Sequence, residues 1–96
     1  MSLVKPAVIT ELNESTYEEI TLPANNKVGG VTCAFYTEDG SSYTKADDDS
    51  GANAVVVPAS TPITYEDITA DGTPQFYALA ATGAGTPNLI AQVVKP

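Results

Sequence analysis

The densest group of oxygen-bearing side chains is the run Asp47-Asp48-Asp49-Ser50-Gly51-Ala52-Asn53. Calcium prefers several oxygen ligands from one short, flexible loop, and the alternating residues Asp47, Asp49 and Asn53 supply some of them. An EF-hand loop that began at Asp47 would need a glutamate at its twelfth position, where this chain has Pro58. The run is therefore predicted to be a solvated acidic loop, with a weak calcium site as the less favoured alternative.

The chain contains few of the residue types that enzymes use for catalysis. The chain has no histidine, which removes the usual general base and every Ser–His–Asp or Cys–His nucleophile. The only cysteine, Cys33, alternates with Val31 and Phe35, so it is predicted to point inward as an inert thiol. Adjacent carboxylates such as Glu18-Glu19 face opposite sides of a strand and do not converge. We expect no enzymatic activity and no cofactor.

Charge and length exclude two further classes of partner. The formal net charge is −8, from 12 acidic residues against four lysines and no arginine, and such a surface repels nucleic acid. No apolar run approaches the roughly 20 residues that span a bilayer, and no signal-peptide core follows Met1. A lone cysteine forms no internal disulfide, which suits a reducing compartment. The expectation is a soluble protein made in the cytoplasm, with no nucleic-acid or membrane partner.

These side chains must be positioned by strands. Valine, threonine and tyrosine are abundant and tryptophan is absent, a composition that favours pleated sheet over helix. The clearest alternation lies in Val31–Thr37, where every second residue is apolar. The predicted strands are 17–22, 31–37, 43–46, 54–57, 63–68, 75–82 and 88–94. Seven or eight strands at this spacing predict a single all-β domain, a β-sandwich or jelly roll over residues 17–96.

Residues 1–16 differ from the rest of the chain. Pro6 removes a ladder donor and limits regular pairing at that point. One interpretation is a first edge strand. The other is an extended N-terminal arm that lies on a neighbouring subunit, because the segment holds much apolar surface for a loose tail. The apolar residues concerned are Leu3, Val4, Val8 and Ile9.

Two tyrosines are candidates for a contact surface. Tyr36 and Tyr77 follow Phe35 and Phe76 directly, so they face outward if the phenylalanines face the core. Tyrosine is common at interfaces and in sugar sites, because its ring offers area and its hydroxyl a hydrogen bond. A carbohydrate- or receptor-binding module that uses exposed tyrosines is therefore one functional hypothesis.

Three stretches together carry a resemblance to a known class. They are Tyr17-Glu18-Glu19-Ile20-Thr21-Leu22-Pro23-Ala24-Asn25, Val57-Pro58-Ala59-Ser60-Thr61-Pro62-Ile63, and Gln75-Phe76-Tyr77-Ala78-Leu79 with its following glycine-rich turn and last strand. This order resembles small virion structural proteins of tailed bacteriophages, including the decoration or cement proteins of capsid shells. The resemblance implies a non-enzymatic protein that stabilises the shell by bridging its subunits.

The same resemblance implies partners and a location. The partner would be the major capsid protein or another virion protein, and the chain would act as a homo-oligomer, with a trimer favoured. It would sit on the outer capsid surface of the virion after synthesis in the host cytoplasm. No functional residue carries over, because the class shares no catalytic motif.

Overall fold

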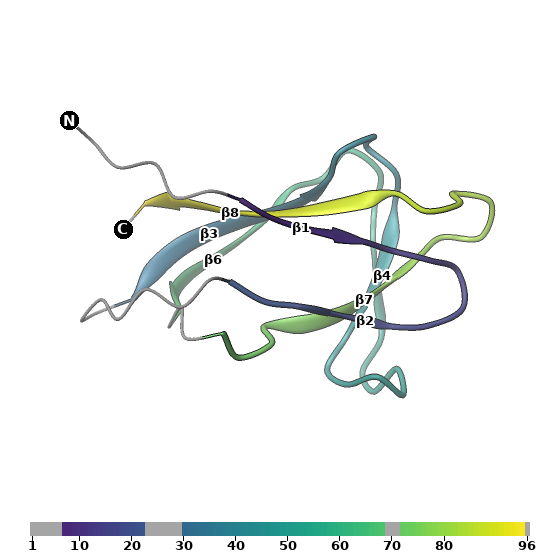
Figure 1. Ribbon diagram of the computed structural model, residues 1–96, viewed down its shortest axis with the longest axis horizontal. Coiled ribbons are helices and arrows are strands. Elements are labelled where there is room, and N and C mark those ends of the chain that lie inside the picture. Colours follow the sequence, from purple (N-terminus) through teal and green to yellow (C-terminus); the bar gives the residue numbers. More distant parts are fainter. Residues whose placement is uncertain (1–6, 23–29, 69–71, 96) are drawn as a thin grey trace.

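The computed structural model describes residues 7–22, 30–68 and 72–95. This part of the chain forms eight strands and no helix, in two antiparallel four-stranded sheets (Figure 1). The strands are β1 (Val8–Glu11), β2 (Glu18–Ile20), β3 (Val31–Thr37), β4 (Tyr43–Ala46), β5 (Val55–Val57), β6 (Ile63–Ile68), β7 (Phe76–Ala80) and β8 (Asn88–Lys95). The all-β prediction and its strand number are confirmed. No membrane-spanning helix is found within the described ranges.

The two sheets lie one over the other in a sandwich-like arrangement. The first sheet has the order β1-β8-β3-β6, and the second sheet has the order β2-β7-β4-β5. Figure 1 shows β1, β8 and β3 as one layer and β2 and β7 as the layer that faces it. Buried residues of both sheets form one hydrophobic cluster, so the core lies between the layers.

The core follows from the alternation in β3. Val31, Cys33 and Phe35 are each at most 1% exposed, and the ring of Phe35 meets that of Phe76 edge to face at 4.9 Å between centroids. Ala78 of β7 is fully buried and belongs to the same hydrophobic cluster. Burying one large apolar side chain contributes about 1.5–3 kcal/mol, so these inward rows hold the layers together.

Residues 8–12 belong to the folded domain. The strand β1 is the outer edge of the first sheet and pairs with β8, which matches the edge-strand interpretation for this segment. Val8 packs against the core, Ile9 is 59% exposed, and the adjacent Leu12 is fully buried. The arm interpretation now concerns residues 1–6 alone. These include Leu3 and Val4, and they lie outside the described residues.

A single carboxylate ties the β1–β2 loop to the β7–β8 loop. Glu14 accepts a hydrogen bond from the backbone N–H of Gly83 at 3.0 Å and another from that of Gly85 at 2.9 Å. Both glycines adopt positive φ, which turns successive N–H groups toward one anion. The loops at this end of the sandwich are therefore held to each other.

Candidate functional site

A row of side chains crosses the outer face of the first sheet. The register pairs Ile9 of β1 with Ile90 of β8, and Ile90 with Tyr36 of β3. Paired residues of an antiparallel ladder project from the same face, and Phe35, the neighbour of Tyr36, lies in the core. The row therefore faces away from the core. Ile90 is only 7% exposed because Ile9 and Tyr36 flank it.

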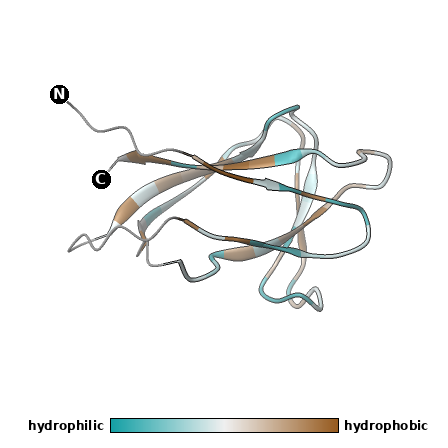
Figure 2. Cartoon of the chain, in the orientation of Figure 1, coloured by the Kyte–Doolittle hydropathy of each residue, from teal (hydrophilic) through white to brown (hydrophobic). Residues whose placement is uncertain are grey.

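The row continues along β8. Gln92 follows Ile90 by two residues and pairs with Ala34, so it shares the face of Ile90, whereas Val94 lies where the pairing of β8 with β3 shifts register. Tyr36 donates its hydroxyl proton to Gln92 Oε1 at 3.2 Å, and Val94 is 56% exposed. Figure 2 shows hydrophobic stretches along both β1 and β8. We call this surface the outer stripe, and its members are Ile9, Tyr36, Ile90 and Gln92. None of the four carries a charge, and the exposed Glu11 follows Ile9 on the same face of β1.

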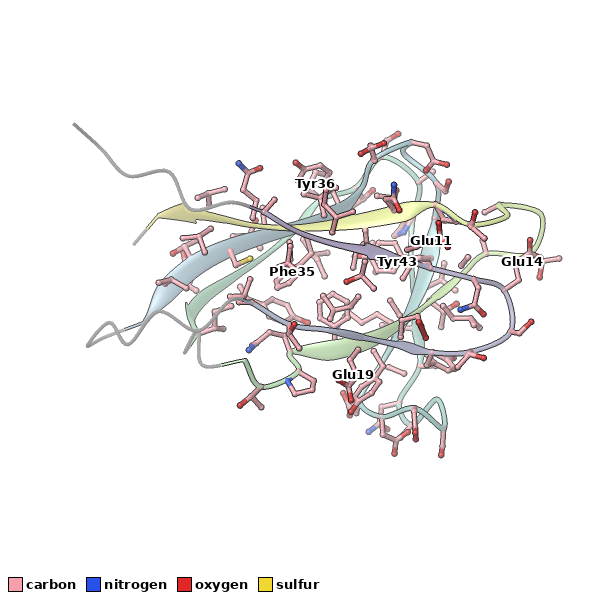
Figure 3. All side chains as sticks on the ribbon, in the orientation of Figure 1. Glu11, Glu14, Glu19, Phe35, Tyr36 and Tyr43 are labelled. Carbon is pink, nitrogen blue, oxygen red and sulfur yellow. The ribbon has the colours of Figure 1, made fainter. Side chains whose placement is uncertain are left out.

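The outer face of the second sheet has a different character. Tyr77 of β7 pairs with Glu19 of β2, so the two side chains share this face. Partial burial raises the pKa of Tyr77, and the negative charges of Glu19, Asp49 and Asp48 raise it further. This face is therefore acidic. Figure 3 places Glu19 and Tyr36 on opposite sides of the molecule.

The two candidate tyrosines consequently do not form one surface. Both project away from the core, as their parity predicted, but the sandwich lies between them. Tyr36 shares its face with Ile9, another predicted contact residue, whereas Tyr77 lies beside carboxylates. Val8 faces the core and contributes little surface. Of the predicted contact residues that are described, Ile9 and Tyr36 are brought together.

The acidic loop satisfies its own polar groups. Asn53 Nδ2 donates to Asp47 Oδ2 at 2.8 Å, and Asp48 Oδ1 accepts from the N–H groups of Ser50 and Ala52 at 2.9 and 3.1 Å. These are turn-type interactions among the side chains and the backbone of the loop itself. The third weak calcium candidate, Asp49, is exposed. Across the described ranges, no group of three or more His, Cys, Asp or Glu has an arrangement suited to a metal ion.

The lone thiol lies where its alternation placed it. Cys33 is fully buried, and burial raises its pKa from 9.0 to about 11. Only the thiolate is a strong nucleophile, so we expect this thiol to be unreactive near neutral pH. The prediction that Cys33 points inward is confirmed, and its inertness stays a prediction.

One charged residue between the sheets was missed by the sequence reasoning. Lys45 of β4 donates from Nζ to the hydroxyl of Tyr65 of β6 at 2.8 Å. Its ammonium lies 5.4 Å from the ring centroid of Tyr65 and 5.7 Å from that of Phe76. A signal was present, since Lys45 has the same parity as the core residue Tyr43.

A small pocket at one end of the sandwich was also missed. It has a volume of about 130 Å³ and lies between the β3–β4 turn and the β5–β6 loop. Its lining residues are Tyr36, Thr37, Gly40, Ser41, Tyr43, Pro58, Ser60, Thr61 and Pro62. The predicted strand limits imply a connection at 38–42 and another at 58–62 but not their meeting, which the 2.9 Å hydrogen bond from Ser60 N–H to the Gly40 carbonyl fixes.

Comparisons with protein-family models, with curated proteins and with solved structures find no match for this chain. The functional argument therefore depends on three surfaces: an uncharged outer stripe, an acidic opposite face and a small pocket beside Tyr36.

Proposed function

We propose that this protein is a non-enzymatic assembly protein that adheres to a larger protein particle through its outer stripe. The observation that carries the proposal is the stripe itself. Ile9 is 59% exposed, and the residues aligned with it across the sheet, Ile90 and Tyr36, are uncharged, on a chain with a net charge of −8. An exposed apolar sheet face that stands out from a charged surface marks a protein contact.

The polarity of the two faces suits such a role. Carboxylates near Tyr77 keep the second sheet in water and keep free copies apart before assembly. A stable contact needs about 800 Å² from each partner, with an apolar centre and a polar rim. The stripe supplies the centre, and neighbouring polar side chains such as Glu11 supply the rim. Binding that favours the intact particle adds to the stability of that particle.

The proposal extends to a specific setting, a capsid decoration or cement protein. Its partner is the major capsid protein or another virion protein, and several copies, with a trimer favoured, repeat the contact around a symmetry axis of the outer shell. Leu3 and Val4, which lie outside the described residues, remain the proposed contacts of an N-terminal arm with the shell or a neighbouring copy. The support for this setting is the order of sequence stretches described above and the chemistry of the stripe.

A second candidate function is favoured by one observation. The ring of Tyr36 and several hydroxyl side chains line the same pocket, a combination that also suits a sugar. A carbohydrate- or receptor-binding module would use this pocket in place of the stripe.

One experiment tests the assembly proposal directly. Virus particles that lack this protein are heated with and without the recombinant chain, and particle disruption is followed by light scattering. The proposal expects saturable binding and a higher disruption temperature. A chain that neither binds nor protects the particles rules the proposal out, and saturable binding on a glycan array would then favour the second function.

A further inference from the structure

The pocket beside Tyr36 has a rigid wall. Besides the Ser60–Gly40 hydrogen bond, the Thr37 hydroxyl donates to the carbonyl of Ser41 at 2.7 Å and fixes the β3–β4 turn. Ser60 has a φ of 55°, a left-handed conformation that residues other than glycine seldom adopt. Gly40 has a φ of 80°, and a Cβ at this position would lie 3.2 Å from Ser60 Oγ. Such backbone strain is concentrated at functional sites, where surrounding contacts maintain it.

All six hydroxyl groups of the lining can accept a hydrogen bond from a ligand, but within the described residues only those of Tyr43 and Ser60 keep a proton to donate to one. A hydroxyl has one proton to donate and two lone pairs that accept. Four lining hydroxyls donate to acceptors of the protein: Tyr36 to Gln92 Oε1, Thr37 to Ser41 O, Ser41 to Asp39 Oδ1 and Thr61 to Ala59 O. Their remaining hydrogen-bonding capacity is therefore acceptor capacity. A ligand that brings N–H donors fits this wall better than one that brings acceptors.

The electrostatics favour a cation. All nine lining residues are uncharged, and the carboxylate of Asp39 lies directly behind Ser41. Hydrogen bonds from the Ser41 hydroxyl and N–H lower the pKa of Asp39, so it stays ionised at neutral pH. The face of the Tyr36 ring is also electronegative. Carboxylates and phosphates are repelled, and an N–H cation is attracted.

The volume of the pocket limits the size of the ligand group that it can hold. Sites for drug-sized ligands measure roughly 300–1,000 Å³, and this pocket measures about 130 Å³, which suits the end of one side chain. A guanidinium is planar, stacks on an aromatic ring and offers five donors, whereas an ammonium is a compact point charge. We infer that the pocket receives an arginine side chain of the partner protein. The chemistry of the pocket alone assigns the class of ligand. The identity of the partner rests on the proposed function. The two are linked because Tyr36 belongs to both the pocket and the outer stripe.

The first experiment uses N-acetyl-arginine amide, followed by ¹H–¹⁵N NMR of the whole chain. The expected result is saturable shifts at the amides of Gly40, Ser41, Ser60 and Thr61, which weaken with added salt. The neutral isostere N-acetyl-citrulline amide should bind about tenfold more weakly, since it lacks charge-assisted hydrogen bonds. Equal binding of arginine and citrulline, or of arginine and the lysine analogue, overturns the inference, as does the absence of saturation.

The second experiment compares two variants that each add one positive charge, one at the edge of the pocket and one away from it. Thr61→Lys places a cation at the exposed edge of the pocket and should abolish arginine binding, whereas Ser50→Lys adds the same charge in the distant acidic loop and should retain it. Both variants are also tested for particle binding. If Thr61→Lys no longer binds arginine but still binds particles, the pocket does not receive an arginine of the partner, and the proposed function stands. If the unmodified chain binds arginine but does not bind particles, the proposed function is wrong and the assignment of arginine as the ligand stands.

Discussion

The ammonium of Lys45 reaches across the sandwich and donates a 2.8 Å hydrogen bond to the hydroxyl of Tyr65. Lys45 lies on β4 of the second sheet and Tyr65 on β6 of the first, so this bond joins the layers. Tyr65 also packs edge to face on Phe35 and Phe76 at 5.3 and 5.9 Å between ring centroids. A polar contact thereby extends an aromatic cluster toward the edge of the core.

Removal of this contact should weaken the domain. Lys45→Ala loses the hydrogen bond, the cation–π contacts and the packed stem, and should lower the free energy of unfolding by about 1–2 kcal/mol. Lys45→Met keeps the stem and should cost less. Urea denaturation measures both. A double-mutant cycle with Tyr65→Phe should give a coupling of about 1 kcal/mol, and zero coupling would show that the bond contributes nothing to folding.

The hydroxyl of Tyr43 is a weak point in the core. Tyr43 is 2% exposed, and its hydroxyl has no hydrogen-bond partner within the described residues. A buried, unsatisfied polar group costs roughly 1–3 kcal/mol, so Tyr43→Phe should leave stability unchanged or raise it by about 1 kcal/mol. Tyr36→Phe is the matched control, because that hydroxyl is bonded to Gln92 and its loss should destabilise slightly. A marked loss of stability in Tyr43→Phe, measured by thermal unfolding, would show that this hydroxyl has a partner.

Alkaline pH should destabilise the fold. Burial raises the pKa of Cys33 from 9.0 to about 11, and burial with the nearby Tyr65 raises that of Tyr43 from 10.0. Above pH 9 the unfolded chain loses the thiol proton while the folded chain retains it, so stability falls as pH rises from about 9 to 11. The thiol alone accounts for roughly 2–3 kcal/mol, since one pKa unit is about 1.4 kcal/mol.

Urea unfolding at a series of pH values checks this. Cys33→Ala has lower stability at every pH because of its cavity, but the slope between pH 9 and 11 should be shallower than that of the wild type. Identical slopes would mean that the thiol does not titrate abnormally.

A charge in the outer stripe should weaken particle binding and leave folding intact. Ile9→Lys places a cation at a residue that is 59% exposed, so stability changes little, but binding to particles should weaken by at least about tenfold. Val56→Lys is the control, because Val56 is 69% exposed on the edge strand of the second sheet. Sedimentation with particles measures both. Equal loss in the two variants would indicate a charge effect unrelated to the stripe.

The Glu14 carboxylate should govern local opening of the β7–β8 loop. Glu14→Ala removes the acceptor for Gly83 and Gly85, and exchange of these two amides should accelerate by roughly fivefold. Glu38→Ala removes an equal charge from another exposed turn and should leave both amides unchanged. Unchanged exchange in Glu14→Ala would show that water replaces the carboxylate without loss.

Local patterns determined most of the secondary structure. The predicted spans 31–37, 43–46 and 63–68 match β3, β4 and β6 at both ends, because alternation and turn residues are properties of neighbouring positions. The parity of Tyr36 was right for the same reason. Which sheet each strand joins depends on residues far apart in the chain, so the separation of Tyr36 from Tyr77 was not predictable.

The candidate sites show the same division. The predicted strand limits imply the connections at 38–42 and 58–62, yet their contact and the pocket between them depend on how β3 to β6 are distributed over two sheets. The bond from Gly83 to Glu14 spans 69 residues, and no local rule signals it. Ile9 was singled out for its apolar character, but its alignment with Ile90 and Tyr36 required the register of β8.

The place of β8 has a consequence for biosynthesis. This strand lies between β1 and β3, so the earliest described strand finds its neighbour only among residues 88–95. Contacts of such long sequence separation slow folding and leave unpaired edges exposed during translation. A ribosome-bound chain that stops before β8 should therefore remain open to proteases, and only copies that contain β8 should acquire the outer stripe.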